Sequence, residues 1–108
     1  EPMVRVETGA WDVLGNEAGR LRSEVFVQEQ RIPADLEWDD GDAVAVHAVA
    51  FNRIGQAVAT GRLLQHETGV GRIGRMAVHR ALRGSGVGRQ VLQALVGMRD
   101  LSLKRDIA

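Results

Sequence analysis

Three glycines at alternate positions, Gly84, Gly86 and Gly88, lie between an apolar segment and a segment with helical periodicity. Because glycine has no Cβ, backbone N–H groups at such positions can approach a bound anion closely. A helix N-terminus adds four unpaired N–H groups and the positive end of the helix dipole. Arg83 and Arg89 flank the glycines, and arginine can bind two phosphate oxygens at once. The loop predicts either a phosphate site or a glycine-rich turn that only begins a helix.

The spacing of these glycines differs from two common phosphate-binding motifs. The Walker A motif requires a lysine directly after its last glycine, and no lysine follows Gly88. The dinucleotide-binding motif requires G-x-G-x-x-G after the first strand, and this spacing is absent at that place. Both of these nucleotide-binding classes are therefore disfavoured.

The composition is that of one ordinary globular domain. The 108 residues are 44% hydrophobic and 26% charged. The absence of cysteine excludes disulfides, thiolate metal ligands and a cysteine nucleophile. No apolar run approaches the roughly 20 residues that span a bilayer, and the N-terminus lacks a basic start followed by an apolar core. We therefore expect a cytoplasmic protein that does not interact with a membrane.

Charge is divided unevenly between the two halves of the chain. Residues 1–54 contain eleven acidic and five basic residues, whereas residues 55–108 contain three acidic and nine basic residues. Because local potential steers ligands, we expect an anionic ligand at the second half and a cationic ligand at the first. Acidic residues crowd residues 35–42, which either attract a cationic substrate or form solvated surface. The dispersed arginines and only four aromatic residues argue against nucleic-acid binding.

Hydrophobic periodicity predicts the elements that position these groups. Alternation predicts a strand over 3–7, and apolar residues three and four apart predict a helix from residue 11 to about 30. An acidic loop follows over 31–42, because Pro33 disfavours a helical conformation at the preceding residue and the carboxylates repel one another.

The second half of the chain has clearer strand signals. Apolar runs at 43–51 and 57–64, joined by a turn, predict a hairpin, and the run at 72–78 predicts a third strand of an antiparallel meander. A second helix follows the glycine loop, and the alternation at 100–104 is compatible with the start of a fifth strand. The buried face of the second helix is predicted to contain Val87, Val91, Leu92, Leu95 and Val96.

The order of these elements, with Arg83-x-x-Gly86-x-Gly88 opening the second helix, resembles the GNAT superfamily of acyl-CoA N-acyltransferases. Residues upstream of the loop are similar to the ElaA-like branch of that superfamily, and the motifs together cover residues 20 to 96. The upstream residues are Leu21, Arg22, Glu24, Val25, Phe26, Val27, Glu29, Gln30, Pro33, Glu37, Asp39, Asp42 and His47. The resemblance implies an α/β fold with a mixed, mostly antiparallel sheet flanked by helices.

The resemblance also implies an activity, namely transfer of an acetyl group from acetyl-CoA to a primary amine of a small molecule or peptide, by direct attack and without a metal. It places the main chain of Met76, Ala77 and Val78 beside the pantetheine arm and the thioester, although an ordinary core strand is the alternative for 72–78. The residues implied to hold the pyrophosphate are Arg83, Gly84, Ser85, Gly86, Val87, Gly88 and Arg89.

An ammonium acceptor must lose its proton before attack, so a carboxylate or imidazole is expected within reach of it. Glu29, Glu37 and His47 are the candidates. Partial burial is expected to raise the pKa of Glu29, unless it is a solvated charge at the helix end. His47 stands alone in an apolar strand, where a core histidine bonded to backbone is the alternative. Many superfamily members use a tyrosine as general acid, but this chain contains no tyrosine, so that role is unassigned.

In the superfamily pattern a strand, a helix and two further strands follow the second helix, whereas this chain ends at Ala108. We therefore expect residues 1–108 to form a single GNAT domain that is incomplete at its C-terminus. An open sheet edge promotes pairing with another strand, so a homodimer that covers this edge is one expectation. The alternative to an active enzyme is an acyl-CoA-binding or assembly module with little or no turnover.

Overall fold

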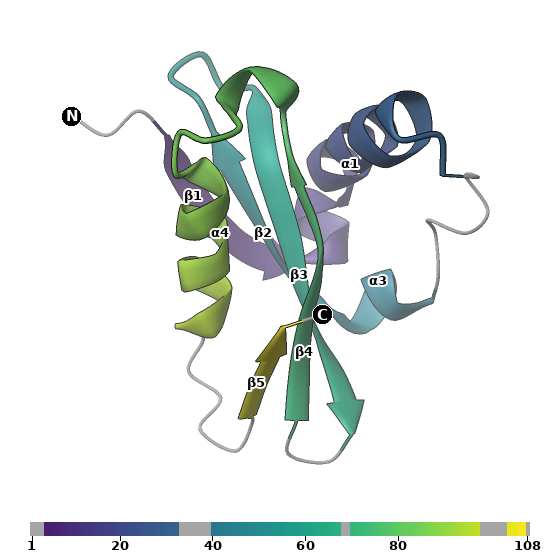
Figure 1. Ribbon diagram of the computed structural model, residues 1–108. Coiled ribbons are helices and arrows are strands. Elements are labelled where there is room, and N and C mark those ends of the chain that lie inside the picture. The colour runs from purple at the N-terminus through teal and green to yellow at the C-terminus, as the bar shows by residue number, and fades with distance from the viewer. Residues whose placement is uncertain (1–3, 33–39, 68–69, 98–103, 108) are drawn as a thin grey trace.

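The described strands form one five-stranded sheet, in which they follow the same order as along the chain (Figure 1). The computed structural model describes residues 4–32, 40–67, 70–97 and 104–107. The antiparallel strands are β1 (Arg5–Ala10), β2 (Val46–Phe51), β3 (Ala57–Glu67) and β4 (Val70–Val78). β5 (Lys104–Ile107) pairs with β4 in parallel. The predicted mixed, mostly antiparallel sheet is confirmed.

The helices are more varied in type than the periodicity predicts. The first helix is α-helical only over α1 (Trp11–Arg22) and continues as the π-helix η1 (Ser23–Glu29). The other helices are α3 (Gly41–Val44), the 3-10 turn η2 (Arg80–Leu82) and α4 (Val87–Val96). Among the described ranges, no helix has both the length and the apolar character that crossing a bilayer requires.

Several boundaries differ from the predictions, among them the end of β3 at Glu67 and the start of β4 at Val70. The first strand continues to Ala10 instead of ending near residue 7, because its ladder with β2 extends to the pair Ala10–Val46. Residues 41–44 form α3, although 41–42 were predicted as loop and 43–44 as strand. The side chain of Val44 is 78% exposed, so this part of the apolar run does not enter the sheet.

The two faces of the sheet pack against different helices, as Figure 1 shows with α4 on one face and α1 on the other. Along β2, Ala48 and Ala50 belong to the cluster that includes the buried face of α4. Val49 and Phe51 alternate with them and pack with α1 residues. Val96 was predicted to be buried on α4, but its side chain is 45% exposed at the end of the helix.

The contact between β3 and α4 depends on a residue without a side chain. A Cβ atom added at Gly61 would lie 2.4 Å from Met76 Sδ, 3.1 Å from Leu95 Cδ1 and 3.3 Å from Val91 Cγ1. Carbon and sulfur atoms do not approach so closely, so any larger residue must displace this part of the core. The absence of a side chain at Gly61 therefore lets α4 and Met76 pack closely over the middle of the sheet.

We predict that Gly61→Ala lowers the free energy of unfolding by about 1–2 kcal/mol through overpacking. Gly9→Ala in β1 is the matched control, because its added Cβ would be 3.6 Å or more from its neighbours. The control is expected to stabilise the fold slightly, since alanine restricts the unfolded chain more than glycine does. Urea denaturation of both variants measures the difference, and equal stabilities would contradict the packing argument.

Candidate functional site

The glycine loop lies between the end of β4 and the start of α4, as predicted. η2 follows β4, and the chain then turns through Gly84 and Gly86, whose φ angles are +85° and +92°. Residues with a Cβ rarely adopt this left-handed conformation, so both positions require glycine. A Cβ added at either residue would meet no atom within 4 Å. The surface of the loop is therefore open to solvent or a ligand at these two glycines.

The N-terminus of α4 is available to an anion. Gly86 is its N-cap residue, and no side chain caps this helix end. The bond from Gln90 N–H to the Gly86 carbonyl, at 3.1 Å, belongs to the first helical turn. The N–H groups of Val87, Gly88 and Arg89 precede it, where an α-helix leaves its donors unpaired. With the helix dipole, this arrangement fits a pyrophosphate or another bound phosphate.

Gly88 is required for a different reason from Gly84 and Gly86. A Cβ added at Gly88 would lie 3.1 Å from Val78 Cγ2, at the end of β4. Close packing of the first turn of α4 on β4 thus requires a small residue here. Gly88 therefore allows α4 to pack closely on β4, whereas Gly84 and Gly86 allow the chain to turn.

β4 contains a β-bulge that includes Met76, the first of the residues predicted to lie beside a bound cofactor. Arg62 pairs with Gly74 and Thr60 pairs with Ala77, so two residues of β4 oppose one residue of β3. Arg75, inside the bulge, has a φ of +53°. A bulge takes backbone groups out of the regular ladder and bends the strand. The regular ladder between β3 and β4 is therefore interrupted at Met76, which lies within the bulge.

Periodicity missed this bulge, although the sequence contains a signal for it. The signal is the three-residue spacing of the apolar residues Ile73 and Met76, which both pack in the core cluster of the α4 face. Residues three apart in a regular strand point to opposite faces, so a shared face requires one extra residue between them.

Glu29 and Arg83 form an ion pair that joins η1 to the glycine loop. The two terminal nitrogens of Arg83 donate to the two carboxylate oxygens of Glu29, at 2.5 and 2.9 Å. The hydrogen bond from Arg83 and its positive charge lower the pKa of Glu29 below its ordinary value. The prediction of a raised pKa is therefore wrong, because this partner outweighs the effect of partial burial.

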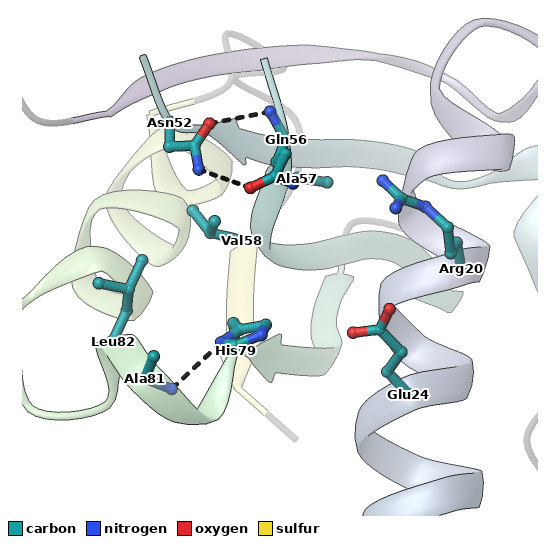
Figure 2. Close-up of a pocket in the computed structure, with 9 residues that line it drawn as sticks. All are labelled: Arg20, Glu24, Asn52, Gln56, Ala57, Val58, His79, Ala81 and Leu82. Atoms are coloured by element: carbon teal, nitrogen blue, oxygen red, sulfur yellow. Dashed lines mark hydrogen bonds between the residues drawn. The ribbon is translucent and has the colours of Figure 1, made fainter. Parts of the chain in front are cut away.

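Two hollows lie along the groove between the first helix and η2. Figure 2 shows one of about 320 Å³, into which Glu24 and His79 point from opposite sides. A second hollow of about 400 Å³ shares these two residues and is also lined by Gln28, Glu29 and Arg80. Glu29 thus lies beside a polar cavity, next to the loop that could hold an anion.

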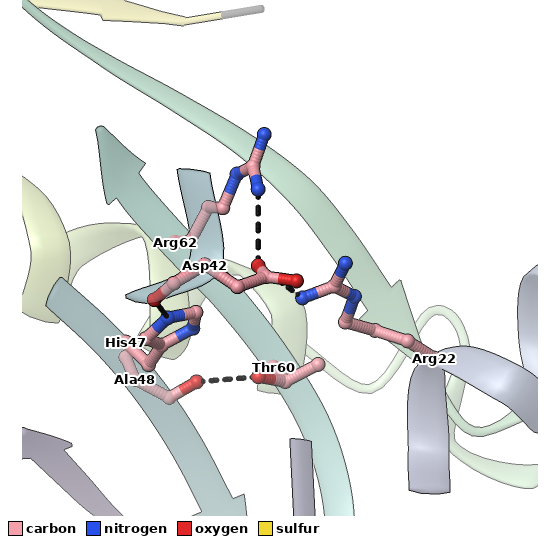
Figure 3. A network of polar contacts seen from close by, with 6 residues as sticks. All are labelled: Arg22, Asp42, His47, Ala48, Thr60 and Arg62. Carbon is pink, nitrogen blue, oxygen red and sulfur yellow. Dashed lines mark hydrogen bonds and ion pairs between the residues drawn. The ribbon is translucent and has the colours of Figure 1, made fainter. Parts of the chain in front are cut away.

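His47 lies in a buried polar network on the α1 face (Figure 3). Its side chain is 1% exposed, and Nε2 is 2.9 Å from the carbonyl oxygen of Asp42. Burial lowers the pKa of His47, which favours the neutral imidazole. This is the backbone-bonded core histidine that the sequence allows as the alternative, and it removes His47 from the solvent-accessible groups that could serve as a base.

Asp42, the last residue of the predicted acidic loop, is a buried anchor. Its Oδ1 accepts hydrogen bonds from Arg22 at 2.7 Å and from Arg62 at 3.0 Å, as Figure 3 shows. The ring of Trp11 contacts the same network, with its centroid 4.8 Å from that of His47 and 5.7 Å from the Arg22 guanidinium carbon. For Asp42, both interpretations of the acidic segment, solvated surface or substrate attraction, are therefore wrong. Residues 33–39, which include Glu37, lie outside the described residues.

Among the described residues, no group of three or more histidine, aspartate or glutamate side chains has the arrangement of a metal site. Two carboxylates of this region are instead engaged by arginine side chains. They are those of Glu29, in its pair with Arg83, and of Asp42, in its buried contacts.

The sequence model of the acetyltransferase (GNAT) family matches residues 11–105 of the chain. Over 75 residues, the chain is 35% identical to the uncharacterized N-acetyltransferase YjcF of Bacillus subtilis. This alignment covers 69% of the chain and 52% of YjcF, so the chain spans about half the length of that relative.

Solved structures with the same fold include an acyl-CoA N-acyltransferase from Pseudomonas aeruginosa, which is 34% identical with a TM-score of 0.73. ElaA from Escherichia coli is 27% identical, also with a TM-score of 0.73. The alignments cover 84% and 85% of this chain and 66% of each of those proteins.

We predict that Asp42→Asn destabilises the fold by about 3 kcal/mol, because it removes the carboxylate that two buried guanidinium groups contact. Glu17→Gln is the control, since the pair of Glu17 with Arg20 is exposed and expected to contribute less than about 1 kcal/mol. Thermal and urea unfolding of both variants test this. A cost at Asp42 no larger than at Glu17 would show that the buried pairs do not hold α3.

We also predict that the free energy of unfolding falls as the pH is lowered through about 6.5. His47 takes up a proton near its ordinary pKa of 6.5 in the unfolded chain, but only at a lower pH in the folded one. Between these values the unfolded chain binds more protons, so acid favours unfolding by up to about 1.4 kcal/mol per pH unit. His47→Gln should show a flatter dependence between pH 7 and 5 and the same slope above pH 7.5. Equal slopes throughout would contradict a neutral buried His47.

Proposed function

Because the chain belongs to the GNAT acetyltransferase family, we propose that it is an N-acetyltransferase that moves an acetyl group from acetyl-CoA to a primary amine. The observation that carries the proposal is the uncapped N-terminus of α4 beside an open glycine loop. The motif Arg83-x-x-Gly86-x-Gly88 occupies this place, where the family similarity predicts the pyrophosphate.

The loop fits the pyrophosphate of acetyl-CoA. The backbone N–H groups of Gly84 and of Gly86 to Gly88 supply donors, while that of Ser85 donates to the Leu82 carbonyl, and the open space beside Gly84 and Gly86 accommodates phosphate oxygens. The side chain of Arg89 is exposed in the first turn of α4, where its positive charge adds to the attraction. The basic second half of the chain strengthens the potential for a ligand with several phosphates.

The bulge of β4 supports the second part of the proposal, which concerns the thioester. In the proposed reaction the amine nitrogen bonds to the acetyl carbon, and the carbon–sulfur bond breaks. The nitrogen loses a proton, and the departing thiolate takes one up. Negative charge develops on the acetyl oxygen, and a backbone N–H beside the bulge, from Met76 or Ala77, can stabilise it. Val78 extends the same row of main-chain groups toward the loop.

The proton acceptor is left unassigned by this proposal. His47 is buried behind Asp42, and Glu29 is engaged with Arg83. The substrate that receives the acetyl group is proposed to be a cationic amine. The first half of the chain is strongly acidic, and Glu24 and Glu29 line the groove beside the loop.

We predict that the chain binds acetyl-CoA and that Gly86→Trp weakens this binding at least tenfold. The indole would fill the open space, and the left-handed conformation of residue 86 would be strained by roughly 1–2 kcal/mol. Isothermal titration calorimetry with acetyl-CoA measures the effect.

Gly55→Trp is the matched control, because Gly55 has a φ of +83° and open space around it but lies in the β2–β3 turn. It should bind acetyl-CoA like the parent chain. Equal affinities for the two tryptophan variants would exclude the glycine loop as the site. Release of free thiol in the presence of a panel of primary amines then separates an enzyme from a module that only binds acyl-CoA.

A further inference from the structure

The side chain of Arg83 links the glycine loop to two other elements. Its Nε donates to the carbonyl of Val78 at 3.2 Å, at the end of β4. Its two terminal nitrogens donate to Glu29, the last residue of η1, 54 positions away in the sequence. This bidentate ion pair matches the planar guanidinium group to the carboxylate and fixes the orientation of the Arg83 side chain. One side chain of the loop thus joins the loop, the strand before it and the first helix.

The loop has few other connections to the rest of the molecule. Its own hydrogen bonds are local, from the Ser85 N–H and hydroxyl to the Leu82 carbonyl and from Arg83 N–H to the Arg80 carbonyl. Residues 83–86 are exposed, and Gly84 and Gly86 have no side chains to pack. Glycine is flexible, so such a loop needs an external contact to keep its N–H groups in one arrangement.

Glu29 is itself held in place by the π-helix. The hydrogen bond from Gln30 N–H to the Val25 carbonyl, at 3.0 Å, spans five residues and closes a turn wider than an α-helical one. Val25 is buried against Ala77 of β4, so η1 is packed on the strand that leads to the loop. The carboxylate is therefore presented to Arg83 from a fixed position.

We propose that Glu29 and Arg83 are positioning residues for the donor site, and that their pair ties the glycine loop to η1 and stays intact when the donor binds. The inference rests on the proposed function, because the loop's ligand is taken to be the pyrophosphate. The phosphates are then held by backbone N–H groups and not by the Arg83 guanidinium. If Arg83 left Glu29, an ionised carboxylate would remain beside the phosphates and repel them.

Three roles for these residues give different results in Glu29→Gln. A positioning pair predicts weaker binding of acetyl-CoA. Competition, in which Glu29 withholds Arg83 from the phosphates, predicts tighter binding, because the substitution frees the guanidinium. A proton-accepting Glu29 predicts a loss of kcat with an unchanged Kd. The sign of the change in Kd therefore separates the proposal from both alternatives.

The binding test uses Glu29→Gln, Arg83→Gln and the double variant, with calorimetric titration of acetyl-CoA. Each single variant is expected to weaken binding about threefold to tenfold. The double variant should bind no more weakly than the single variant with the lower affinity, because all three variants lose the same ion pair. Glu17→Gln, which breaks an exposed pair on α1, is the control and should bind normally. Tighter or unchanged binding by Glu29→Gln would overturn the proposal.

A second measurement tests the tie without any ligand. Amide hydrogen exchange of Ser85 and Gln90, whose N–H groups are hydrogen-bonded in the loop and the first turn of α4, should be faster in Glu29→Gln and Arg83→Gln than in the parent chain, and unchanged in Glu17→Gln. Unaltered exchange in the first two variants would refute the positioning role, whether or not the chain binds acetyl-CoA. If the parent chain fails to bind acetyl-CoA, the proposed function fails, while the exchange result still decides the role of the pair.

Discussion

The packing of α4 on one face of the sheet determines where its uncapped N-terminus lies. Val87, Val91 and Leu95 are fully buried, and burying each side chain contributes about 1.5–3 kcal/mol, so the helix has one stable position. Gly88 allows its first turn to approach Val78, and Gly84 and Gly86 allow the chain to turn into it from β4. The position of the uncapped helix N-terminus, which suits an anion, therefore depends on the apolar packing of the helix beside it.

The opposite face is organised by buried charge instead. Asp42 meets Arg22 of α1 and Arg62 of β3, while its carbonyl meets His47 of β2. Buried ions are costly unless they are paired, so this network strongly disfavours any arrangement in which α3 leaves the sheet. The acidic segment of the chain therefore ends at a fixed point between the first helix and the sheet.

β4 connects these two faces to the chemistry proposed for the chain. One face of the strand packs against α4, and Ala77 packs against η1. Its bulge interrupts the ladder with β3, and its end leads into the glycine loop. In GNAT terms, the donor is proposed to run along this strand from loop to bulge. The ion pair of Glu29 with Arg83 spans the same region and joins the first helix to the glycine loop.

The sequence by itself determined the hairpin, the strand β4, the helix α4 and the glycine loop, because apolar periodicity and the conformational freedom of glycine are local properties. It also contains the Arg83-x-x-Gly86-x-Gly88 pattern, which is similar to the family motif. Only the tertiary structure decided where Asp42, His47 and Glu29 lie and which groups they contact. The carboxylate of Asp42 binds residues 20 positions away on either side, and the pKa of Glu29 is lowered by a partner 54 positions away. Interactions between charged side chains depend on their separation in space, which periodicity along the chain does not encode.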